Sequence, residues 1–119
     1  MPRKIAVIGD LFMLSAIFEE AIRERCRLFE IAIRRRDFQW PDAPMEHGYA
    51  VEGMDGLKEY MGSAEEVVDL AGDAEMLVTH LAPLSAGIMD RLPNLRFVAV
   101  SRGGPVNVDM AAARQRGIV

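Results

Sequence analysis

The feature that most constrains the fold is an apolar run, a glycine turn and a helix in direct succession near the end of the chain. Phe97–Val100 predicts a buried strand, and Gly103-Gly104-Pro105 interrupts it. Asp109 is a good N-cap for the alanine-rich helix that follows and ends at Gly117. A strand that leads through a glycine turn into a helix indicates an α/β domain. Ile118-Val119 begins another apolar run, so we expect the chain to be a truncated part of a longer protein.

The same alternation extends back to the amino terminus and predicts the sheet. Ser63 and Glu66 form a capping box that begins a helix, and Gly72 ends it. Residues 37–62 stay unassigned. The alternation predicts a mostly parallel sheet with helices on both faces. We expect strands over 4–8, 28–33, 76–79 and 96–100, and helices over 63–72, 85–92 and the apolar stripe of Leu14, Ile17, Phe18, Ala21 and Ile22.

Composition limits the class of protein. The 119 residues are 50% hydrophobic, which fits one globular domain, and no run is long enough for a membrane span or a secretory signal. With Cys26 as the single cysteine, an internal disulfide is excluded, so we expect a packed thiol and a cytoplasmic protein. The net charge of −4 disfavours nucleic acid as a partner, and the run Arg34-Arg35-Arg36 is interpreted as a solvated strand end or loop.

The candidate site lies beyond the carboxyl ends of the strands, where open parallel sheets bind their ligands. Three loops qualify: Gly9 to Leu14, His80 to Leu84, and Ser101 to Val108. In the last, Gly103 and Gly104 would let backbone N–H groups approach an anion. A tight turn that needs positive φ explains these glycines equally well.

Three polar residues near these loops carry competing interpretations. Arg102 could bind a carboxylate, although an arginine at a strand end is more often solvated or structural. Asn107 could bond a ligand or hold the loop through its own backbone, and His80 could contact a ligand or be a satisfied polar residue. The histidines and carboxylates show no metal-ligand spacing, so no metal is expected.

The sequence lacks two nucleotide-binding motifs and the loop residues of two other folds of this size. It contains no G-x-G-x-x-G and no Walker-type phosphate loop. A receiver domain would have paired acids after the first strand, where Asp10 stands alone. A flavodoxin would have a Ser/Thr-rich loop there, and Gly9 to Met13 is not one.

The residues from Leu77 to Leu84, from Asn94 to Asp109 and from Arg116 to Val119 resemble the NAD-dependent D-isomer-specific 2-hydroxyacid dehydrogenases, in particular the phosphoglycerate dehydrogenase branch. The resemblance implies a flavodoxin-like fold with a mostly parallel sheet. It also implies that residues 1–119 are the first part of the substrate-binding domain. The Rossmann cofactor domain would then lie outside this chain.

The resemblance also assigns roles. It implies that Gly103 and Gly104 offer backbone amides to the substrate carboxylate and that the turn His80-Leu81-Ala82 lines the same cleft. The loop from Ser101 to Val106 is shorter than the common family pattern. The family's catalytic arginine, glutamate and histidine would lie outside these residues, so no catalytic residue is assigned.

The expected function is substrate recognition in an enzyme that oxidises the C2 hydroxyl of a small anionic 2-hydroxy acid or reduces the corresponding 2-oxo acid. NAD would bind the full-length protein, a homodimer, but not this chain alone. The alternative is a free-standing flavodoxin-like binding or interaction module. Continuation of the reading frame past Val119 would distinguish the two.

Overall fold

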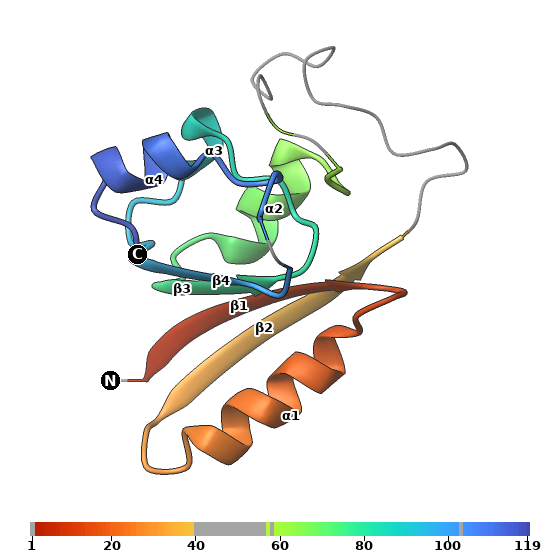
Figure 1. Ribbon diagram of the computed structural model, residues 1–119. Helices are drawn as coiled ribbons and strands as arrows, with labels where there is room; N and C mark the ends of the chain where they lie inside the picture. Colours follow the sequence, from red (N-terminus) through yellow and green to blue (C-terminus); the bar gives the residue numbers. More distant parts are fainter. Residues whose placement is uncertain (1, 40–56, 58, 103) are drawn as a thin grey trace.

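The computed structural model describes residues 2–39, 57, 59–102 and 104–119 and contains a fully parallel sheet. The sheet has four strands in the order β2-β1-β3-β4 (Figure 1). They are β1 (Arg3–Asp10), β2 (Ile31–Phe38), β3 (Met76–Thr79) and β4 (Phe97–Val100). The parallel α/β sheet predicted from the sequence is confirmed.

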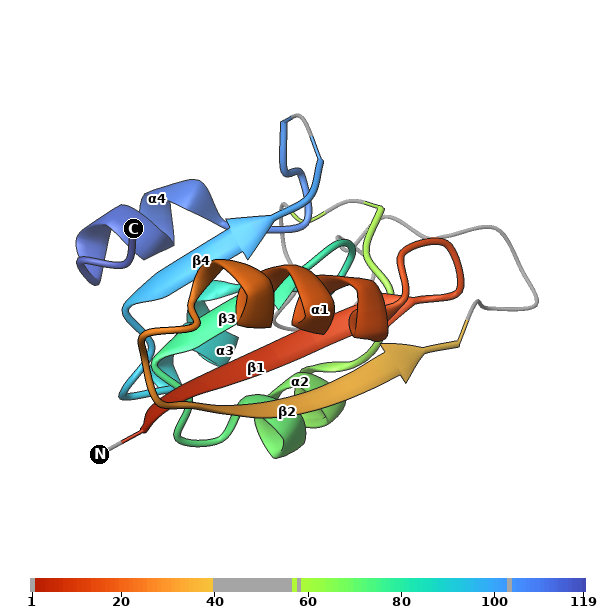
Figure 2. The ribbon, with the colours of Figure 1, turned by 90° about the horizontal axis from the view of Figure 1, so that it is seen from below.

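Helices cover both faces of this sheet. Helix α1 (Ser15–Arg25) connects β1 to β2 on one face. Helices α2 (Ala64–Ala71), α3 (Ala86–Asp90) and α4 (Met110–Gln115) lie on the other face, as Figures 1 and 2 show. The connection that follows β1 therefore leads to β2 at one edge of the sheet, and the connection that follows β3 leads to β4 at the other edge.

The main core lies between the sheet and the three helices α2, α3 and α4. Alternate residues of β1 point to this side, because successive side chains of a strand face opposite ways. Ala6 and Ile8 are each 1% exposed there. They pack with residues of the helices and of the neighbouring strands, among them Val67, Leu70, Leu77, Leu84, Ile88 and Ala112.

The helices on the core side begin at the caps that the sequence indicates. The Ser63 hydroxyl accepts from the Glu66 N–H and the Glu66 carboxylate accepts from the Ser63 N–H, which completes the capping box. The Asp109 carboxylate caps α4 by accepting from the Ala112 N–H. Both predicted helix starts are confirmed.

Helix α1 differs from its prediction in what it buries. Its predicted apolar stripe is largely open, and the side chain of Ile17 is 55% exposed. The residue before the helix, Leu14, provides no side-chain cap. The carboxylate of Asp37 on β2 accepts from the Ser15 N–H at 2.6 Å instead. Spacing alone could not show that the cap comes from a distant strand.

Strand β2 begins later than predicted. The sequence placed a strand over residues 28–33, whereas Leu28 and Phe29 lie in the preceding turn and are exposed. The strand instead includes the arginines at 34–36, which are exposed, and among the described strands β2 lies at the edge of the sheet beside β1. The apolar residues at 28 and 29 led to a predicted start that is too early. The arginines led to a predicted end that is too early, since an edge strand tolerates charged side chains.

Two further expectations concern the cysteine and the last residues. Cys26 is a free, partly buried thiol at the end of α1. Ile118 is 7% exposed, and Val119 exchanges backbone hydrogen bonds with β4, from Val98 N to Val119 O at 2.9 Å and from Val119 N to Arg96 O at 3.0 Å. These two bonds pair Val119 with the beginning of β4. Within the described residues, no helix has the length and apolar character that crossing a membrane requires.

Candidate functional site

The carboxyl ends of β1 and β3 lie next to each other at the middle of the sheet, where the strand order reverses. The strands are neighbours, and their connections run to opposite sides of the sheet. Ligands of open α/β sheets bind at such a switch point, because the two outgoing loops separate and leave a crevice. The residues that follow β1 and β3 are therefore the first candidates for a site.

A buried carboxylate and an imidazole meet at this point. Asp10, the last residue of β1, is 1% exposed. Its Oδ1 accepts from the backbone N–H groups of Phe12 and Met13 at 2.8 and 2.9 Å. Its Oδ2 lies 2.8 Å from Nδ1 of His80, the residue after β3. A carboxylate has only acceptors, so the network assigns a proton to Nδ1 of His80.

The imidazole is held from a second direction by the loop after β1. The ring of Phe12 stacks on that of His80 with 5.9 Å between centroids and 25° between planes. The His80 side chain is only 15% exposed, whereas Phe12 is 73% exposed. Within the described residues, Nε2 of His80 has no hydrogen-bond partner.

The turn after β3 is fixed to the loop after β4 by the Asn107 side chain and by two backbone hydrogen bonds, from Leu84 N to Asn107 O and from Asp109 N to Leu84 O, each 2.9 Å long. The Asn107 side chain is fully buried, and its Nδ2 donates to the carbonyl of Ala82 at 2.8 Å. Its Oδ1 is buried without a partner in the described part of the chain. Leu81 and Ala82 are buried too, so His80 is the partly exposed residue of this turn. Asn107 joins the two loops that the sequence proposed as one cleft.

The glycine loop after β4 is described at Gly104, while Gly103 lies outside the described residues. Gly104 has φ of +72°, a left-handed conformation that favours glycine. A Cβ placed there would meet no atom within 4 Å. The turn interpretation therefore holds at Gly104, and no described residue beyond its chain neighbours fills the space beside its Cα.

Arg102 is already engaged by a carboxylate of the chain. Its Nη2 lies 2.9 Å from Oε2 of Glu59, and Nη1 donates to the Glu59 carbonyl at 3.2 Å. The Arg102 side chain is 19% exposed. A ligand carboxylate would have to share this guanidinium with Glu59. No spacing in the sequence connects the two residues, since they are far apart along the chain.

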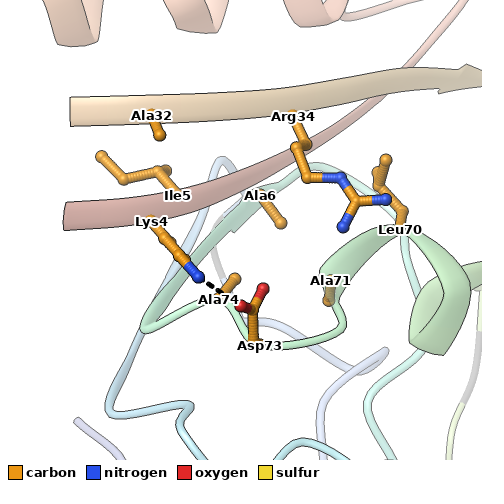
Figure 3. Close-up of a pocket in the computed structure, with 9 residues that line it drawn as sticks. All are labelled: Lys4, Ile5, Ala6, Ala32, Arg34, Leu70, Ala71, Asp73 and Ala74. Carbon is orange, nitrogen blue, oxygen red and sulfur yellow. Dashed lines mark hydrogen bonds and ion pairs between the residues drawn. The ribbon is translucent and has the colours of Figure 1, made fainter. Parts of the chain in front are cut away.

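The groove in Figure 3 lies away from this site. It has a volume of about 290 Å³ and lies at the amino half of β1 and β2, beneath the end of α2. Lys4 forms an ion pair with Asp73 at its rim. The ligand crevice of a parallel sheet lies at the opposite, carboxyl end of the strands. The groove is therefore not the candidate site.

The candidate site consists of the backbone amides of these loops and one imidazole, which is held by the buried carboxylate of Asp10. In the described part of the chain no group of His, Cys, Asp and Glu side chains gathers as metal ligands.

Asp10 and Phe12 were not singled out from the sequence, although they lie in the first of its three candidate loops. The signal that could have found Asp10 is the pairing of β1 with β3.

Comparison with known proteins identifies the family. The catalytic domain of the D-isomer specific 2-hydroxyacid dehydrogenases matches residues 43–119. A hydroxypyruvate reductase of Blautia hydrogenotrophica is 37% identical over 54 residues, which are 45% of this chain and 17% of that protein. A glycerate dehydrogenase of Methylorubrum extorquens is 36% identical over 63 residues, which are 51% of this chain and 20% of that protein.

A solved structure shows the fold over nearly the whole chain. It is described as a D-3-phosphoglycerate dehydrogenase oxidoreductase from Ralstonia solanacearum, and it superposes with a TM-score of 0.54 at 18% sequence identity. The superposition covers 98% of this chain and 28% of that one, so the chain spans well under a third of the length of this relative. The match to the catalytic-domain family extends over most of the chain, which therefore belongs to the D-isomer specific 2-hydroxyacid dehydrogenases.

Proposed function

We propose that this chain forms the substrate-binding side of an NAD-dependent oxidoreductase that interconverts a small 2-hydroxy acid and its 2-oxo acid. The observation that carries the proposal is the junction of two loops at the carboxyl edge of the sheet. The Asn107 amide holds the turn at 80–82 against the loop that contains Gly104. In this arrangement the substrate carboxylate accepts from backbone N–H groups of the glycine loop, and the turn with His80, Leu81 and Ala82 forms the adjoining wall.

The chemistry assigned to these residues is binding and orientation. Backbone amides at a glycine turn form an anion-binding concavity, since they carry partial positive charge and no side chain obstructs them. Arg102 would add charge at the rim while it remains paired with Glu59. The Asn107 side chain is buried, so it fixes the loops. No residue of the chain is assigned the transfer of hydride or of a proton.

The remaining parts of the proposal concern the whole protein. The chain is the first part of the substrate-binding domain, and NAD binds to a domain outside these residues, because this chain has no glycine fingerprint for a dinucleotide. Reduced NAD supplies the hydride when it is bound there. The full-length enzyme would act as a cytoplasmic homodimer on a small anionic acid, with no role for nucleic acid or membrane.

A matched pair of glycine variants of the full-length protein tests the substrate contact. Gly104 and Gly117 have φ of +72° and +69°, and neither would bring a Cβ within 4 Å of another atom. Gly104→Ala and Gly117→Ala therefore carry the same backbone strain, about 1 kcal/mol each. Only Gly104 belongs to the proposed site.

We expect Gly104→Ala to raise KM for the 2-oxo acid about tenfold or more while kcat changes less, because the contact binds ground state and transition state alike. Gly117→Ala should leave KM as in the wild type. Steady-state kinetics measures both. Equal KM values in the two folded variants would show that Gly104 has a purely structural role.

A further inference from the structure

The three arginines of β2 are divided between the two faces of the sheet, because successive side chains of a strand point opposite ways. Arg35 lies on the α1 side, where its Nε is 2.8 Å from a Glu19 carboxylate oxygen and its Nη1 donates to the Ser15 hydroxyl at 3.2 Å. Arg34 and Arg36 therefore lie on the side of α2. Of the three, Arg34 lines the groove drawn in Figure 3.

The guanidinium of Arg34 has donors to spare. Within the described residues it makes one long hydrogen bond, 3.5 Å from Nη2 to the Asp69 carbonyl in the last turn of α2. A guanidinium carries five N–H donors, so most of those of Arg34 have no partner in this part of the chain. Gly72, which ends α2, leaves the group uncovered, since a Cβ placed there would lie 3.6 Å from Nη1.

The register of β1 and β2 explains the groove beside this guanidinium. Lys4 pairs with Ala32, and Ala6 pairs with Arg34. The two cationic side chains therefore stand at opposite corners of a patch whose other corners are alanines, and the short alanine side chains leave space above the sheet. The groove has a volume of about 290 Å³, close to the lower end, about 300 Å³, of small-molecule sites. Its far side is formed by Leu70, Ala71 and Ala74.

The charges that line the groove leave one cation uncompensated. A hydrogen bond from Lys4, and then its charge, lower the pKa of Asp73 below the usual value, so this carboxylate stays ionised and neutralises Lys4. Arg34 is the remaining charged residue of the lining. The groove thus carries one net positive charge in a chain whose net charge is −4.

We infer that this groove is a second ligand site, which takes a small acid with one carboxylate and an apolar chain or ring. The carboxylate accepts from Arg34, since a guanidinium matches a carboxylate with two parallel hydrogen bonds. The apolar part lies over Ala6 and Ala32. A doubly charged phosphate fits less well, because its second charge would face Asp73.

The groove is separate from the candidate substrate site. Lys4 lies near the amino end of β1, and Asp10 is its last residue. With a rise of about 3.3 Å per residue, the two positions are about 20 Å apart. A ligand in the groove therefore does not compete with a substrate at the carboxyl ends of the strands, and the inference does not depend on the proposed function.

NMR titration of benzoate with the full-length protein tests the inference, with benzamide as the uncharged analogue of the same shape. We expect benzoate to bind, and benzamide to bind about tenfold more weakly or less, because it lacks the charge that Arg34 pairs with.

Three variants assign the binding to the groove. Arg34→Gln should raise Kd for benzoate about tenfold or more. Arg36→Gln is the matched control: it removes a charge from the same face of β2 but from a residue outside the lining, so Kd should stay near the wild-type value. Ala32→Leu fills the floor, retains Arg34 and should also raise Kd. Thermal melts show whether each variant is folded.

The inference is overturned if the wild type does not bind benzoate, if benzamide binds as tightly, or if inorganic phosphate binds more tightly. Equal Kd values for the wild type, Arg34→Gln and Ala32→Leu would also exclude it, since benzoate would then bind elsewhere, for example at the candidate substrate site. If Arg34→Gln does not fold, Ala32→Leu decides, because Ala32 is exposed and its replacement removes no hydrogen bond.

Discussion

At the scale of single residues, Thr79 joins the two strand ends at the candidate site. Its hydroxyl is fully buried, donates to the Ile8 carbonyl at 2.8 Å and accepts from the Ala82 N–H at 3.1 Å. One side chain thereby connects β1, β3 and the turn that contains His80. The residue is not part of any motif, so the sequence showed only that it ends a strand.

We expect Thr79→Val to lower the free energy of unfolding by about 2 kcal/mol, because it retains the shape and leaves a buried carbonyl and a buried N–H without partners. Thr79→Ser, which retains the hydroxyl, should cost less. Urea denaturation of the chain measures both. A valine variant as stable as the serine variant would show that water replaces the lost bonds.

At the scale of elements, the sequence correctly predicted the features that neighbouring residues determine, but not those that depend on contacts between distant parts of the chain. The capping box at Ser63, the strand Met76–Thr79 and the Asp109 cap are each specified by neighbouring residues, and each is confirmed. The start of β2 and the environment of α1 depend on edge position and on the distant cap from Asp37. In the site, the glycine turn was visible in the sequence, whereas the contact of Asp10 with His80 required the strand order.

The capping box gives a prediction for α2. Ser63→Ala should destabilise the chain by about 1 kcal/mol, since it leaves the Glu66 N–H without its acceptor. Ser101→Ala, at an exposed serine after β4, is the control and should be close to neutral. Chemical denaturation of both variants provides the comparison, and equal stabilities would contradict the assigned cap.

The contact between α2 and α3 gives a pH prediction. Hydrogen bonds from Arg91 and then its charge lower the pKa of Glu65 below the usual value. A carboxyl with a lowered folded pKa contributes stability above its unfolded pKa, about 4.3, and loses it as the pH falls through the folded value. Glu65→Gln should therefore be slightly less stable than the wild type at pH 7, and the difference should vanish near pH 2. Urea titrations at the two pH values test the sign, and a difference that persists in acid would contradict it.

At the scale of the whole molecule, apolar side chains remain exposed on the α1 side of the sheet and around the first loop. Leu28 is 97% exposed and Phe12 is 73% exposed. Others with large exposed areas are Leu11, Ile17, Phe29 and Phe97. Exposed apolar surface of this kind commonly marks a contact with other protein.

We therefore expect the 119-residue chain on its own to self-associate or to be only marginally stable. Light scattering across a concentration series, together with a thermal melt, measures this. The replacement of Leu28 and Phe29 by serine should reduce the association. A monomer at high concentration with a cooperative melt would favour a free-standing module.

We propose that the chain recognises the substrate of a 2-hydroxyacid dehydrogenase, whereas the cofactor binds outside these residues. The most direct test measures NADH oxidation with hydroxypyruvate and pyruvate by the full-length protein, together with calorimetric titration of NADH into the 119-residue chain. We predict turnover by the full-length protein and no NADH binding by the chain. A full-length protein that reduces no 2-oxo acid, or a chain that binds NADH with micromolar affinity, would contradict the account.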